Sequence, residues 1–159
     1  MGLWKQLCEK ADRAVEPYKQ MLRFDGKVYF IESPEEIGYD STKTLTDILG
    51  RHAGLSQNGN VYLFKIDRMK EVYLEKGKDE FIVVLEGLLK HELRHWHQEK
   101  VGSWILGKDL WKKFYKNLYL KYGYRDCPLE VDARTIEYGR PQMMTDVVKR
   151  WIRENPDCL

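Results

Sequence analysis

The sequence predicts an α+β fold, with a small mixed sheet in the first half of the chain and helices before and after it. Two segments, Lys27–Glu32 and Asn60–Asp67, are rich in β-branched and aromatic residues and are bounded by turn signals. A third segment, Asp79–Lys100, contains no proline and repeats its apolar residues at helical spacing. Strands in one half and helices in the other are typical of α+β proteins.

The first strand is expected directly after an N-terminal helix. Leu3–Phe24 is amphipathic and should be interrupted or end near Pro17, because proline disrupts a helix interior. An Asp-Gly turn then leads into the strand Lys27–Glu32, and Thr44–His52 predicts a short helix.

The second strand is expected after a turn at Ser56–Gly59. In Asn60–Asp67, the residues Val61, Leu63, Lys65 and Asp67 alternate with Tyr62, Phe64 and Ile66, so the two sets point to opposite faces of the strand. We expect Met69–Lys76 to continue as a further short strand.

The long segment Asp79–Lys100 predicts a helix with two different faces. At about 100° per residue, one face collects the residues Phe81, Val84, Leu85, Leu88, His91, Glu92, His95 and Glu99. The opposite face collects Glu86, Lys90, Arg94, His97 and Gln98. The first turns should therefore lie in the core, and the second half should turn its histidines into a cleft.

The rest of the chain predicts three further helices. Trp104–Arg125 mixes aromatic residues with lysines, a pattern that a nucleic-acid surface can also show. Leu110, Phe114, Leu118 and Tyr122 share helical spacing there, which favours a packed amphipathic helix. Pro128 is placed to begin the next helix, and Gln142–Glu154 should form the last.

His91-Glu92-Leu93-Arg94-His95 reads H-E-x-x-H within the long predicted helix. Histidines four residues apart on a helix point the same way, so their rings can share one zinc ion. A glutamate after the first histidine can accept a proton from water at that metal. The alternative is a core helix with two incidental histidines, which would bury polar groups at a cost.

A catalytic zinc site needs a third protein ligand. His97 should point to the far side of the helix, and His52 lies in a predicted turn. Glu130 is the better candidate, because it shares a helix face with Ala133, where a second helix can approach closely. Asp132 points elsewhere on the same helix.

H-E-x-x-H followed by E-x-x-A on a later helix resembles the gluzincin branch of the zincin metallopeptidases. The resemblance covers residues 79 to 139 and implies that His91, His95 and Glu130 bind Zn²⁺ and that Glu92 is the general base. It also implies a zincin-like minimal metallopeptidase fold with an active-site helix and a third-ligand helix. An edge strand would pair with extended substrate, and we assign that edge to Asn60–Asp67.

The chain departs from the family at Arg134, where many gluzincins carry an acidic or amide residue that supports a metal histidine. Arginine cannot accept a hydrogen bond, so the support must come from Asp132, Glu137 or a backbone carbonyl. Tyr122 or Tyr124 is a candidate donor to an oxyanion, although anchoring of the loop is the ordinary role for either.

The function implied is a zinc-dependent endopeptidase acting on a protein or peptide. Two alternatives stay open: a zinc-binding structural or interaction module without turnover, and another metallohydrolase such as a nuclease. A deformylase would need an upstream cysteine ligand, and only Cys8 lies upstream, far from any matching motif.

The composition agrees with one domain over residues 1–159. A net charge of +2 implies no nucleic-acid partner, and no stretch has the length of a membrane span. Cys8, Cys127 and Cys158 are odd in number and scattered, which suits a reducing compartment, and a packing role is the default for Cys127. We therefore expect a cytoplasmic protein of open oligomeric state. The resemblance to small peptidases of bacteria, phages and mobile elements implies a phage-encoded protein that acts inside a bacterial host.

Overall fold

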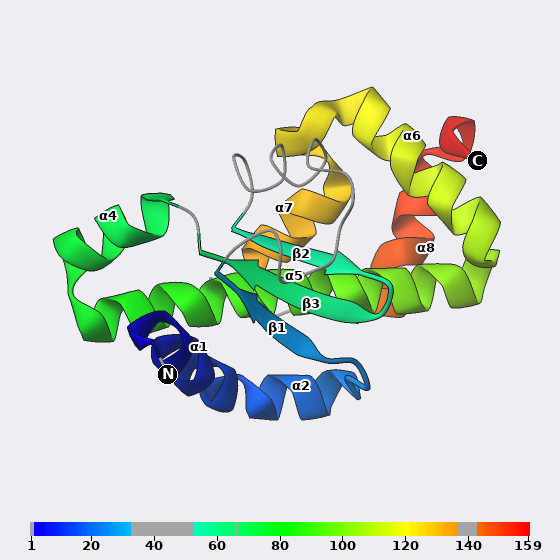
Figure 1. The fold of residues 1–159 in the computed structure, drawn as a ribbon. Helices are drawn as coiled ribbons and strands as arrows, with labels where there is room; N and C mark the ends of the chain where they lie inside the picture. Colours follow the sequence, from blue (N-terminus) through cyan, green and yellow to red (C-terminus); the bar gives the residue numbers. More distant parts are fainter. Residues whose placement is uncertain (1, 33–52, 66, 137–142) are drawn as a thin grey trace. The chain divides into compact units, whose positions relative to one another are not determined.

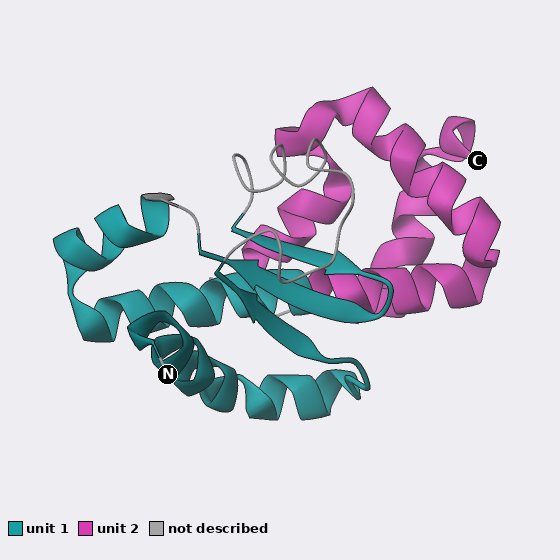
Figure 2. Cartoon of the chain, viewed as in Figure 1, with its two compact units in different colours: residues 1–93 teal, residues 94–159 magenta. Residues whose placement is uncertain are grey.

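The computed structural model describes residues 2–32, 53–65, 67–136 and 143–159 (Figure 1). The chain divides into two compact units, residues 1–93 and 94–159 (Figure 2). The division falls inside one continuous helix, α5 (Lys78–Leu106). No helix in the described ranges combines the length and the apolar run that a bilayer crossing requires.

The first unit begins with two consecutive helices, α1 (Leu3–Ala14) and α2 (Glu16–Leu22). The break between them falls at Val15, two residues before Pro17, so the expected interruption is confirmed. Proline sits in the first turn of α2, where its missing N–H costs no helical hydrogen bond.

The sheet has three strands in the order β1-β3-β2, from β1 (Val28–Ile31), β2 (Gly54–Gln57) and β3 (Asn60–Phe64). β1 runs parallel to β3, and β2 runs antiparallel to it, so the sheet is mixed as predicted.

β2 and β3 form a hairpin with a two-residue loop, Asn58 and Gly59. Both loop residues have positive φ, of 53° and 81°, as a type I′ turn requires. The turn is therefore tighter than predicted, and Ser56 belongs to a strand that we had not expected.

Two strand predictions are wrong. Asn60–Asp67 was assigned to the edge, but β3 pairs on both sides, and β2 and β1 are the outer strands of the described sheet. Met69–Lys76 was expected to be a strand and lies in helix α4 (Asp67–Lys76). Its lysines, glutamates, methionine and leucine are good helix formers, and this local preference outweighs a short alternating pattern. The predicted helix Thr44–His52 lies outside the described residues.

The second unit is helical throughout its described part. It contains the end of α5, then α6 (Lys108–Asp126), α7 (Pro128–Thr135), α8 (Met144–Glu154) and the short 3₁₀ helix η2 (Pro156–Cys158). These helices bear out the three predicted for this region. Gly107 and Gly123, with φ of 82° and 77°, give the chain its turns before α6 and near its end.

The second unit has its own apolar core. Its buried members are Trp111, Phe114, Leu118, Cys127, Leu129, Met144, Val147, Val148, Trp151 and Cys158. Trp111 lies so close to Gly102 of α5 that a Cβ there would fall 2.3 Å from the indole. The predicted face of α6 is shifted, because Trp111 is buried while Leu110 and Tyr122 are each 38% exposed.

Candidate metal centre

The two histidines of the motif lie one turn apart on α5, as predicted. One ligand atom from each of His91, His95 and Glu130 lies within 4.8 Å of the other two. Both histidines are half-buried and Glu130 is buried. The structure therefore brings together the three residues selected from the sequence as metal ligands.

His95 and Glu130 define the geometry most closely. The distance from His95 Nε2 to Glu130 Oε1 is 3.1 Å, and the other ring nitrogen, Nδ1, lies 2.8 Å from the side-chain oxygen of Gln98. Nε2 is therefore the ring atom that faces the carboxylate.

Glu130 is held in place from two directions. It lies in the first turn of α7, where its backbone N–H donates to the carbonyl oxygen of Cys127 at 2.9 Å. The Tyr119 hydroxyl donates to Glu130 Oε1 at 2.8 Å. Burial and the nearby Glu130 charge both raise the pKa of Tyr119, so its hydroxyl stays protonated and remains a donor.

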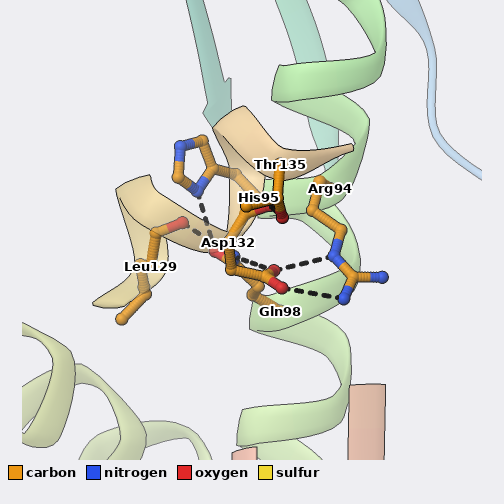
Figure 3. A network of polar contacts seen from close by, with 6 residues as sticks. All are labelled: Arg94, His95, Gln98, Leu129, Asp132 and Thr135. Carbon is orange, nitrogen blue, oxygen red and sulfur yellow. Dashed lines mark hydrogen bonds and ion pairs between the residues drawn. The ribbon is translucent and has the colours of Figure 1, made fainter. Parts of the chain in front are cut away.

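A polar network surrounds the His95 side of the site (Figure 3). The Gln98 amide nitrogen donates to the Leu129 carbonyl oxygen at 3.0 Å and to Asp132 Oδ2 at 2.8 Å. Arg94 binds Asp132 with two nitrogens, Nε to Oδ2 at 2.7 Å and Nη2 to Oδ1 at 3.0 Å.

This network corrects the predicted faces of α5. The periodicity placed Arg94 and Gln98 on the face opposite the apolar one, yet they are only 2% and 0% exposed. Residues of α7 bind both side chains here, on the face that the periodicity placed opposite the apolar one. The hydrogen-bond partner of His95 Nδ1 is Gln98, which was not among the candidates. Asp132, which was a candidate, accepts a hydrogen bond from Gln98 instead.

Glu92 lies in the first unit, against strand β2. It is 8% exposed, and a Cβ built on Gly54 would fall 2.8 Å from Glu92 Cγ and 3.1 Å from its Oε1. Only a residue without a side chain allows the strand backbone to approach the carboxylate this closely. The sequence signal was the glycine that begins β2, which we did not connect with Glu92.

Several candidates lie elsewhere. Asp132 is not in the ligand group and is occupied by Arg94 and Gln98. Tyr122 donates its hydroxyl to Asn155 at 2.7 Å, which favours the anchoring role, and Tyr124 stacks on Tyr119. Arg134 donates to the Arg125 carbonyl oxygen, and Glu137 and His52 lie outside the described residues.

His97 is half-buried and was expected to be solvated. Its Nδ1 is buried without a hydrogen-bond partner among the described residues. Burial and the nearby Arg94 charge lower the pKa of His97, so the ring is neutral at pH 7. It takes no part in the ligand group.

Cys127 lies in the core, in agreement with a packing role. It is the residue before α7, and burial raises the pKa of its thiol to about 11, so it is protonated at neutral pH. A protonated thiol is a poor metal ligand and a poor nucleophile.

The donor set fits zinc. Two imidazoles and a carboxylate are a common catalytic zinc set, and ligand atoms about 2.0–2.1 Å from a tetrahedral ion lie roughly 3.3 Å apart. The 3.1 Å between His95 Nε2 and Glu130 Oε1 is close to that value. When the proton of a neutral His95 ring lies on Nδ1, facing the Gln98 oxygen, Nε2 presents a lone pair to the Glu130 carboxylate. Two acceptors at this distance need a cation between them, either a proton or a metal ion.

Compared with protein-family models, with curated proteins and with solved structures, the chain gives no significant match.

Proposed function

We propose that the protein is a zinc-dependent endopeptidase with a protein or peptide substrate, of the gluzincin type that its motifs resemble. The observation that carries the proposal is the convergence of His91, His95 and Glu130, with Glu92 directly following the first histidine. Three protein ligands and an adjacent carboxylate are what hydrolysis at a zinc ion requires.

The chain's own residues would divide the reaction among them. His91, His95 and Glu130 would hold the ion, which when bound acidifies water and polarises a carbonyl group. Glu92 would accept the proton of the attacking water and return it to the leaving amine. Its near-complete burial against β2 limits competing solvation of the carboxylate.

The position of β2 supports a peptide as substrate. It is an outer strand of the described sheet, and its first residue contacts Glu92. An extended peptide that paired with β2 would run past the proposed base, with affinity supplied by main-chain hydrogen bonds. β2 thus takes the role that we first assigned to Asn60–Asp67.

The test compares the wild-type protein with Glu92→Gln. Both should contain one zinc per chain by elemental mass spectrometry, because residue 92 is outside the ligand group. In a proteome-wide cleavage screen the variant should lose turnover by roughly 10²–10⁴-fold, the usual contribution of a general base.

Each outcome discriminates between functions. Zinc without peptide cleavage in the wild type would favour a structural or interaction module. Cleavage that persists in Glu92→Gln would reject Glu92 as the base. A wild-type protein without zinc that folds normally would reject the metal centre.

A further inference from the structure

Gln98 is fully buried and makes three hydrogen bonds through its side-chain amide. Its amide nitrogen donates to the Leu129 carbonyl oxygen and to Asp132 Oδ2, and its amide oxygen faces His95 Nδ1 (Figure 3). A buried amide whose nitrogen and oxygen both have hydrogen-bond partners is held in one orientation.

The orientation of the Gln98 amide follows from its partners. Leu129 offers a carbonyl oxygen and Asp132 a carboxylate oxygen, and both can only accept. A flipped amide would place its oxygen against both acceptors and leave no donor for either. The amide oxygen must therefore face His95, and His95 Nδ1 must carry the proton.

We infer that Gln98 is a positioning residue that keeps a proton on His95 Nδ1 and thereby reserves Nε2 for the metal. Without it, the neutral ring would place its proton on Nε2, where the Glu130 carboxylate accepts it at 3.1 Å. That arrangement would occupy the metal-binding atom. Gln98 therefore acts on zinc affinity through His95 and touches neither substrate nor metal.

Gln98 also joins the two helices that carry ligands. It lies three residues after His95 on α5, and its acceptor Leu129 directly precedes Glu130 on α7. Asp132 holds the other amide hydrogen and is itself fixed by Arg94. One side chain thus sets the ring of His95 and the backbone next to Glu130 together.

The first experiment reads the His95 protons directly, by long-range ¹H–¹⁵N spectroscopy of the zinc-free full-length protein labelled at histidine. The wild type should keep a proton on Nδ1, whether the ring is neutral or charged. Gln98→Leu should move the proton of the neutral ring to Nε2. A neutral wild-type ring protonated on Nε2 would overturn the inference without any variant.

The second experiment measures zinc affinity by competition with a chromophoric chelator and rests on the proposed metal centre. Gln98→Leu should bind zinc roughly 10–100-fold more weakly, the usual cost of losing a hydrogen-bond partner of a metal histidine. Gln20→Leu, at an exposed glutamine of α2, should match the wild type. An affinity within twofold of wild type in Gln98→Leu would overturn the inference. No zinc binding in the wild type would reject the proposed function, while the proton measurement would still decide the role of Gln98.

Discussion

Gly54 influences the site because it has no side chain. Its α-carbon lies so near Glu92 that an added methyl group would fall 2.8 Å from Glu92 Cγ, closer than carbon atoms pack. Because the neighbouring strand backbone is fixed by pairing with β3, the glutamate would have to move. The position of the proposed base therefore depends on a strand residue far from it in sequence.

We predict that Gly54→Ala lowers kcat/KM for peptide cleavage by roughly 10–100-fold, since a displacement of about 1 Å in a catalytic group can cost 10²-fold. Zinc content should not change, because Gly54 lies against Glu92, which is outside the ligand group. Ser56→Ala in the same strand is the matched control. Full activity in Gly54→Ala would show that Glu92 has another productive position.

The histidines separate into ligands and non-ligands. We predict that His91→Ala or His95→Ala abolishes zinc binding, whereas His97→Ala and His52→Ala leave about one zinc per folded chain. The reason is that His97 lies outside the ligand group and its buried Nδ1 faces no described partner. Elemental analysis with circular dichroism as the folding check decides this, and a folded but zinc-free His97→Ala protein would contradict the site.

At the scale of the element, α5 shows what periodicity can and cannot predict. Spacing identified the helix and the shared direction of His91 and His95, because both depend only on helical geometry. It misplaced Arg94 and Gln98, because a charged or amide side chain can be buried when another helix supplies its partner. That partner, Asp132, is 38 residues beyond Arg94.

The sheet and α4 show a related limit. The residues of Lys27–Glu32 and Asn60–Asp67 alone predicted strands, and the structure has strands at Val28–Ile31 and Asn60–Phe64. The order of the strands in the sheet was not predicted, because the residues of a strand do not by themselves determine which strand is central. Gly54–Gln57 was missed because it contains one glycine and two polar residues and has little strand preference of its own.

Helix α7 permits a sharp separation of ligand from support. We predict that Glu130→Ala lowers zinc affinity by far more than Asp132→Ala. Asp132→Ala should instead lower the free energy of unfolding by about 3 kcal/mol, because it removes the carboxylate that binds the buried Arg94 guanidinium.

Chelator competition and urea unfolding on both variants measure the two effects separately. Because Asp132 also holds Gln98, a smaller loss of zinc affinity is expected in Asp132→Ala. A greater loss of affinity in Asp132→Ala than in Glu130→Ala would show that the third ligand lies two residues later.

At the scale of the whole molecule, zinc binding should stabilise the folded chain, because the ligands converge only after folding. A ligand that binds only the native state at 100 times its Kd contributes about 2.7 kcal/mol. For a chain of this length we predict a rise in Tm of roughly 5–10 °C. Thermal unfolding in buffered free zinc measures it, with His95→Ala as the control. An equal rise with Mg²⁺, or a rise in His95→Ala, would indicate binding elsewhere.

Arg94 occupies one of the two positions that the H-E-x-x-H pattern leaves open, yet its pairing with Asp132 removes that freedom here. Replacing Asp132 first would leave the buried Arg94 guanidinium without its carboxylate. Replacing Arg94 first would leave the Asp132 carboxylate without its guanidinium. The two positions should therefore be inherited as a unit, changing together or not at all. Among related chains, a lineage without arginine at 94 should also have lost the acid at 132.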